Sequence, residues 1–170
     1  MFAIICFGRL DMKKYIVIGL IIFSFSCHTQ TEKVNTDKKS EIAIVEQTIK
    51  NTIAWAKEKD TSLLYSIIAN DENYLEVHPE KTVVHGISEF KKAERFWLDP
   101  RFKHVKFETW DMHINISNDG TTAWYYCMLN DINDWDGQSA SWENTRWTGV
   151  LEKRDGKWKM VQMHFSHSVE

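Results

Sequence analysis

Three side chains near the end of the chain could carry chemistry: Arg146, His164 and His167. An arginine can hold a carboxylate or an enolate oxygen in a fork of donors, and a histidine can move a proton near neutral pH. On a strand, however, residues three apart point to opposite faces, so His164 and His167 cannot share a metal ion. The other domain histidines, which show no ligand spacing either, are His78, His85, His104 and His113. We therefore expect no metal site.

The turn between the last two predicted strands decides whether Arg146 and His164 meet. If this turn has three residues with Gly156 left-handed, Arg146 lies opposite His164. If it has only two residues, the register slips by one and Arg146 shares a face with Phe165. We favour the first alternative, because it leaves one mixed face and one apolar face. The mixed face then carries Asn144, Arg146, Thr148, Gln162, His164 and Ser166, with Trp142 and Trp158 at its ends.

The mixed face suits the wall of a small-molecule cavity, in which apolar walls give affinity and a few polar groups orient the ligand. Arg146 and His164 would be the polar groups, and they favour a small apolar or carboxylate-bearing ligand. The alternative is that both residues line a solvated strand face. The predicted ligand-binding residues, on this strand pair and on neighbouring elements, are Arg146, His164, Asn144, Trp142, Trp97, Trp110 and Tyr125.

Asp111 and His113 form a second candidate pair, because residues two apart on a strand share a face. An acid beside a histidine is the chemistry of a proton-transfer enzyme. The sequence does not decide whether this pair lies on the same face as Arg146, so we assign no catalytic residues. The apolar face is predicted to be the outer face of the sheet and to pair two copies of the chain through Trp147, Leu151, Val161, Met163 and Phe165.

The elements that must position these residues change along the chain from helices to strands. Apolar residues at three- and four-residue spacing predict helices over residues 42–56, 63–68 and 87–97. Aromatic and β-branched segments between turn residues predict strands over 74–77, 82–84, 105–116, 121–131, 140–153 and 157–166. This order indicates an α+β domain with helices on one face of a strongly bent, mainly antiparallel sheet.

The order of elements and the final strand pair resemble the SnoaL-like group of the nuclear transport factor 2-like superfamily. The motifs that carry the resemblance are Arg146-x-Thr148, Asp155-Gly156-x-Trp158-Lys159 and His164-x-Ser166, and the resemblance covers residues 40–167. It implies three helices packed on a curved sheet that forms a cone around an internal cavity, often in a dimer. Members of the group include isomerases, dehydratases, polyketide cyclases, binding modules and association domains, so the fold does not choose among these functions.

Residues 1–26 are expected to be a signal peptide, and Met12 is expected to be the true start of translation. Two lysines follow Met12, then an apolar stretch over residues 15–23, then Cys27. This pattern resembles a bacterial lipoprotein signal, in which the cysteine is lipidated and becomes the new N-terminus. The alternative is an ordinary secretory signal with an incidental cysteine. Residues 27–39 would form the lipidated N-terminus and a polar tether, and residues 40–170 the domain.

The net charge and the predicted signal peptide narrow the range of functions that we expect. The 170-residue chain has a formal net charge of −3, which gives no electrostatic argument for nucleic acid. We expect no cofactor, and we expect a bacterial cell-envelope protein, periplasm-facing or on the surface, that meets the membrane only through its lipid. The favoured function is non-catalytic binding of a small, partly apolar ligand in the cone cavity of a dimer. The alternative is an isomerase, dehydratase or cyclase that uses His164 or Asp111 as acid or base.

Overall fold

The computed structural model describes residues 37–168 of this chain. The chain from Glu41 onward forms one compact unit, which carries the predicted domain. The predicted signal peptide, the lipidated Cys27 and most of the tether lie outside the described residues. No helix within residues 37–168 is long and apolar enough to cross a membrane.

The helices lie over residues 37–58, Thr61–Ile67 (α2) and Gly86–Leu98 (α3). The first, called the long helix below, buries Val45 and Ile49, which are four residues apart and so share one face. It ends at Lys59, whose φ of 52° lies in the left-handed region that commonly ends a helix. Asp60 then caps α2, because its side chain accepts a hydrogen bond from the Leu63 amide at 2.9 Å.

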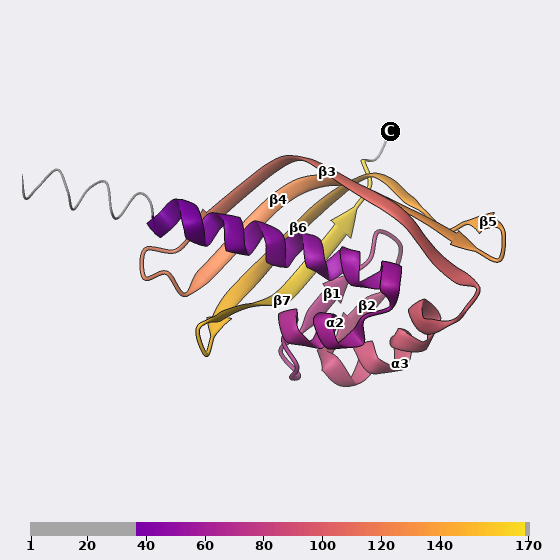
Figure 1. Cartoon of the computed structure of the whole chain (residues 1–170), viewed down its shortest axis with the longest axis horizontal. Helices are drawn as coiled ribbons and strands as arrows, with labels where there is room; N and C mark the ends of the chain where they lie inside the picture. Colours follow the sequence, from indigo (N-terminus) through magenta and orange to yellow (C-terminus); the bar gives the residue numbers. More distant parts are fainter. Residues whose placement is uncertain (1–36, 169–170) are drawn as a thin grey trace, which may run out of the picture. The chain divides into compact units, whose positions relative to one another are not determined.

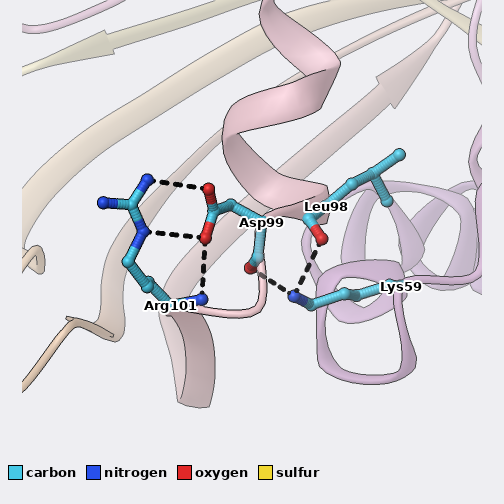
Figure 2. Close-up of polar contacts among 4 residues, drawn as sticks. All are labelled: Lys59, Leu98, Asp99 and Arg101. Atoms are coloured by element: carbon cyan, nitrogen blue, oxygen red, sulfur yellow. Dashed lines mark hydrogen bonds and ion pairs between the residues drawn. The ribbon is translucent and has the colours of Figure 1, made fainter.

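The end of α3 is fastened to the end of the long helix (Figure 2). The Lys59 ammonium group donates to the backbone oxygens of Leu98, at 3.3 Å, and Asp99, at 2.6 Å. The Arg101 side chain and backbone amide donate to the Asp99 carboxylate. The hydrogen bonds from Arg101 lower the pKa of Asp99 to about 2. A cation on the last carbonyl groups complements the helix dipole, so Lys59 both caps α3 and holds it in place.

A curved sheet of seven strands carries these helices (Figure 1). Its order is β2-β1-β7-β6-β4-β3, with the short β5 paired to β4. Neighbouring strands are antiparallel except β1 and β7, which run parallel. The strands are Leu75–Val77 (β1), Val83–His85 (β2), Phe102–Ile116 (β3), Thr122–Trp135 (β4), Gln138–Ser139 (β5), Trp142–Arg154 (β6) and Lys157–Ser166 (β7).

Irregular positions bend the long strands, because a bulge adds a residue to one strand and increases its twist. Register shifts fall between His104 and Lys106, Trp110 and His113, Leu129 and Asp131, and Val150 and Leu151. The helices pack on the concave side, where the largest fully buried side chains include Trp147, Tyr74, Phe165, Ile49 and Leu64. The predicted α+β class, with three helices on a curled and mainly antiparallel sheet, is confirmed.

The last hairpin has the two-residue turn, so the predicted pairing of Arg146 with His164 is wrong. Asp155 and Gly156 have φ angles of 51° and 73°. Two left-handed residues form the tight turn whose twist matches that of antiparallel strands, and Asp-Gly favours it. This turn alone would place Arg146 opposite Phe165, and with the bulge described next Arg146 lies opposite Ser166.

A bulge in β7 restores the predicted sharing of faces. Val150 pairs with Gln162 and Leu151 with Met160, so Val161 is an extra residue without a partner in the ladder. Side chains alternate between the two faces with a period of two. The one-residue shift from the shorter turn and the one-residue shift from the bulge therefore together return each side chain to the predicted partner face. The polar side chains of the hairpin therefore share one face, as predicted.

The two faces of this hairpin are reversed relative to the prediction. Arg146 and His164 are exposed on the outer face. The apolar face, predicted to be the outer one, lies on the concave side under the helices, and its residues are buried: Trp147 0%, Leu151 0%, Val161 8%, Met163 4% and Phe165 2% exposed. The apolar face is reversed because the helices cover only the concave side, and burial there removes large side chains from water.

Candidate functional site

The concave side of the sheet holds a cavity of about 620 Å³, within the range of small-molecule sites. Helices supply one wall and strands the other. The apolar lining includes Trp55, Ala56, Leu64, Phe90, Trp97, Phe102, Trp142, Met163 and Phe165. Polar side chains from the long helix, α3, the β1 and β4 regions and residues 139–141 also belong to the lining.

Aromatic rings hold one another in place around the cavity. The Trp97 ring stacks on Phe90, with centroids 5.5 Å apart, and meets Trp55 edge-on at 6.4 Å. On the strand side, Trp142 packs against Phe165 with centroids 5.0 Å apart. Such pairs add stability beyond burial alone, so the apolar walls are built before any ligand arrives.

One polar part of the lining, here called the Glu76 triad, consists of Tyr74, Glu76 and His78. Residues two apart on an extended chain point to the same side, which brings the three side chains together along β1. The Tyr74 hydroxyl donates to Glu76 Oε2 at 2.8 Å, and His78 Nε2 lies 2.9 Å from Glu76 Oε1. The Glu76 side chain is 6% exposed and that of His78 is 15% exposed. Glu76 thus orients the His78 imidazole from a more buried position, and the side chain of His78 is the more exposed of the two.

The charge of Glu76 sets the proton affinity of both neighbours. Burial lowers the pKa of His78, but the hydrogen bond and charge of Glu76 outweigh burial, so that pKa lies above its ordinary value. Burial, followed by the charge of Glu76, raises the pKa of Tyr74 well above its ordinary value. Tyr74 therefore stays a protonated donor, while His78 can gain or lose a proton near neutral pH.

A second polar part, here called the Asp131 cluster, joins β3 to β4 through His104, Asp131 and Asn133. Asn133 Nδ2 donates to Asp131 Oδ2 at 2.9 Å, and His104 Nδ1 lies 3.0 Å from Asn133 Oδ1. His104 Nδ1 is also 3.2 Å from Asp131 Oδ1, but its N–H points at Asn133, so Oδ1 is buried without a well-directed hydrogen bond. Burial lowers the pKa of His104, but Asp131 offsets burial and leaves that pKa raised.

Trp142 lies between the two polar parts. Its ring centroid is 5.2 Å from that of His78, and its backbone pairs with Asp131 across β4 and β6. The cavity therefore combines an aromatic interior with the Glu76–His78 pair and with Asp131, whose partner His104 lies behind the lining.

Two of the seven predicted ligand-binding residues, Trp97 and Trp142, line the cavity. Tyr125 is buried in the core and does not reach the lining. Its ring meets Trp147 edge-on at 5.3 Å, and its hydroxyl lies 3.9 Å from Met160 Sδ. Tyr125 lies on the concave side of the sheet, as predicted for a cavity residue, but it packs in the core.

The other four predicted residues lie outside the cavity on the outer face of the sheet: Arg146, His164, Asn144 and Trp110. Met128 pairs with Trp110 on one side and with Arg146 on the other, which places all three on that face. Trp110 is 40% exposed there. Their outward position follows from the reversed faces of the hairpin.

The alternative acid–base pair also points outward. Asp111 Oδ1 and His113 Nε2 are 2.9 Å apart, but the side chains are 55% and 68% exposed. His113 pairs with Tyr126 on the outer face. Neither this pair nor His164 therefore faces the cavity.

The Glu76 triad and the Asp131 cluster were missed by sequence reasoning. Tyr74, Glu76 and His78 alternate along β1 and the residues beside it, which is a readable signal, but the prediction placed His78 in a turn and singled out none of the three as site residues. The Asp131 cluster has no local signal, because its members come from two strands whose pairing includes a bulge.

The sulfur chemistry available in the domain is limited. Cys127 is fully buried, and burial raises the pKa of its thiol to about 12, so it stays protonated and unreactive. Within residues 37–168, no three His, Cys, Asp or Glu side chains gather closely enough to hold a metal ion.

Known proteins resemble this chain in sequence and in fold. A family model described as a SnoaL-like domain matches residues 45–170. No curated protein matches the chain.

Several solved structures share the fold at low sequence identity. A candidate dehydratase of the nuclear transport factor 2-like family from Streptomyces avermitilis is 18% identical, with a TM-score of 0.64 over 78% of this chain and 99% of that one. A nuclear transport factor 2-like protein from Cytophaga hutchinsonii is 14% identical, with a TM-score of 0.60 over 74% and 97%. A hexachlorocyclohexane dehydrochlorinase (LinA, type 2) is 13% identical, with a TM-score of 0.65 over 79% and 90%.

Proposed function

Because this chain belongs to the family of SnoaL-like domains, whose model matches residues 45–170, we propose that its cavity binds a small, partly apolar molecule without transforming it. The observation that carries the proposal is the cavity of about 620 Å³ with stacked aromatic walls and polar groups on one side. Apolar walls supply affinity and the polar groups fix orientation.

Filling the cavity tests this proposal. Ala93 lines the cavity from α3, so Ala93→Trp should block it, whereas Glu58→Trp adds the same ring to an exposed position of the long helix. Native mass spectrometry after incubation with a small-molecule library should find bound molecules on the parent chain and on Glu58→Trp, and none on Ala93→Trp. Equal capture by both variants would place binding outside the cavity.

A second candidate function is proton transfer of the isomerase or dehydratase type, which the Glu76 triad favours. A buried carboxylate holds His78 by Nε2 and leaves Nδ1 for another partner, which is the arrangement of an oriented general base. In D₂O, a captured carbonyl compound should then exchange the hydrogen on the carbon next to its carbonyl. His78→Asn should stop the exchange without releasing the compound. No exchange by the parent chain would leave binding as the function.

The outer face of the sheet is proposed to pair two copies of the chain. Trp110 and Trp124 are 40% and 47% exposed there, and Tyr126, Met128 and Val150 lie between or beside them on the same face. A cluster of exposed aromatic residues is typical of protein interfaces. Light scattering should give twice the chain mass for the parent and the single mass for Trp124→Glu.

The domain is proposed to reach the cell envelope through a lipid on Cys27, with residues 1–26 removed. The support is the sequence pattern alone, since these residues lie outside the part that the structure describes. Labelled palmitate should enter the parent chain and not Cys27→Ala, while Cys127→Ala should label normally. Release of the parent chain as an unlabelled soluble protein would favour an ordinary secretory signal.

A further inference from the structure

We infer that the ligand of this cavity carries an organic ammonium group, held by aromatic ring faces and by the carboxylates of Glu76 and Asp131. This inference rests on the proposed binding function and specifies the chemistry of the ligand.

The aromatic lining is the first observation. Seven phenylalanine and tryptophan side chains from helices and strands line this cavity: Trp55, Phe90, Phe96, Trp97, Phe102, Trp142 and Phe165. The face of an aromatic ring is negative and attracts a cation within about 6 Å of its centre, more strongly once water is excluded. An apolar interior built from rings therefore accepts alkylated ammonium groups as well as hydrocarbon.

The carboxylates are the second observation. Glu76 is 6% exposed and Asp131 is 14% exposed, and both belong to the lining. Within residues 41–168, no lysine or arginine lies within 4.0 Å of either carboxylate, and the only charge partners are His78 and His104. Buried carboxylates normally have a permanent cation beside them. Each histidine offers a positive charge only when it is protonated, whereas a ligand ammonium would supply a charge that does not depend on pH near neutrality.

The positions of the basic side chains argue against a carboxylate ligand. Arg146, which suggested one in the sequence, lies on the outer face. Lys92 and Arg95 belong to the lining but are exposed on α3. A ligand carboxylate inside the cavity would meet Glu76 and Asp131, and like charges repel strongly where water is scarce.

Matched probes on the unmodified chain separate charge from shape. Benzyltrimethylammonium and neopentylbenzene have the same size, since a quaternary carbon replaces the nitrogen, and phenylacetate carries the opposite charge. Tryptophan fluorescence should report binding because Trp55, Trp97 and Trp142 line the cavity. The ammonium probe should bind roughly tenfold more tightly than neopentylbenzene, and phenylacetate should bind most weakly.

Two isosteric variants then locate the charge. Glu76→Gln and Asp131→Asn should each weaken the ammonium probe by roughly tenfold and leave neopentylbenzene unchanged. Glu108→Gln, at a side chain that is 58% exposed and outside the cavity, is the control and should change neither. Circular dichroism and melting curves identify any variant that fails to fold, and the probe series on the parent chain does not depend on the variants.

Each result of the probe series has a definite meaning. Equal binding of the ammonium and neutral probes, or preference for phenylacetate, would overturn the ammonium inference and leave the proposed binding function standing. Binding of none of these probes, together with no capture from the library, would remove the binding function and the ammonium inference with it.

Discussion

Gly149 occupies a position on β6 where the sheet has no room for a side chain. A Cβ atom there would lie 2.6 Å from Tyr125 Cε1 and would also contact the backbone oxygen of Gln162. Both neighbours are fixed, one by burial in the core and the other by the sheet. The absence of a side chain at this position lets Tyr125 and the sheet approach each other.

Gly149→Ala should therefore lower the free energy of unfolding by about 3 kcal/mol, because the added methyl group overpacks the core. Urea unfolding measures the change. Gly120→Ala is the control: nothing lies within 4 Å of its Cβ position, and only its φ of +70° is unfavourable, at about 1 kcal/mol. Equal losses in the two variants would mean that the core around Tyr125 adapts.

His78 makes the stability of the domain depend on pH. Its folded-state pKa is raised because the pull of Glu76 exceeds the effect of burial, so the folded chain binds the proton more tightly than the unfolded chain. The stabilisation is fully present below the ordinary pKa of about 6.5 and is lost as pH rises through the higher folded-state value.

The unfolding free energy should consequently fall as pH rises above about 6.5, and less steeply in His78→Asn. Urea melts at intervals of half a pH unit measure the slope. His104, whose pKa is also raised, contributes with the same sign and should account for the slope that remains. An identical slope in His78→Asn would show that Glu76 does not favour the protonated ring.

At the residue scale, the candidate site was only partly predictable. Trp97 could be placed from the helix pattern because it lies near the end of a helix that faces the core. Trp142 was predicted to share a face with Arg146, and it reaches the cavity because the β4–β6 register shifts between Leu129 and Asp131. Arg146 and His164 could not be placed, because the sequence shows which side chains share a face and not which face the helices cover. Glu76 was missed because its partner His78 lies one residue past the end of β1.

Glu41 ties the long helix to the β6–β7 hairpin. Its Oε2 accepts hydrogen bonds from Lys153 Nζ at 2.9 Å and from Trp158 Nε1 at 2.8 Å, and these bonds lower its pKa. A lowered pKa gives stabilisation that is present above the ordinary value of 4.5 and disappears as pH falls through the folded-state value.

Glu41→Gln should cost at most about 1 kcal/mol at pH 7, because the carboxylate is 35% exposed and water screens the pair. The difference from the parent chain should shrink as pH falls below 4.5 through the folded-state pKa of Glu41, because the protonated carboxyl group is then uncharged like the amide. Glu46→Gln removes an exposed pair with Lys50 on the same helix and should change stability by less than about 0.5 kcal/mol. A loss at pH 3 as large as that at pH 7 would contradict the electrostatic origin.

Lys59 holds the last turn of α3, which lines the cavity (Figure 2). Lys59→Met keeps the length of the side chain and removes its hydrogen bonds. Hydrogen exchange in residues 95–99 should then quicken by roughly tenfold, which corresponds to about 1.4 kcal/mol of local opening. Lys57→Met, two residues earlier and exposed, should leave exchange unchanged.

At the element scale, the order and type of helices and strands followed from periodicity, while the last hairpin required information that periodicity lacks. Asp155-Gly156 permits turns of two or three residues, and each alone would set a different register. The bulge at Val161 has no signature among its apolar neighbours. The turn and the bulge each shifted the register by one residue in the same direction, and a total shift of two residues changes the pairing but keeps the shared faces.

For the whole molecule, pairing through Trp110 and Trp124 would link stability to protein concentration. Whatever binds only the folded chain raises its melting temperature by mass action, and a second copy does so in proportion to its own concentration. The melting temperature of the parent chain should rise when the protein concentration is increased about a hundredfold. The melting temperature of Trp124→Glu should stay constant. A flat response of the parent chain would contradict the dimer.

The parallel contact between β1 and β7 determines when the cavity can exist during the life of the chain. Leu75 pairs with Gln162 and Val77 with His164, so the strand that carries Glu76 gains its place in the sheet only from a strand made about ninety residues later. A nascent chain on the ribosome can therefore form its helices and the β3–β4 hairpin while the Glu76 triad still has no sheet to join. A message truncated before β7 would therefore produce a chain in which the strand that carries Glu76 lacks its neighbour in the sheet.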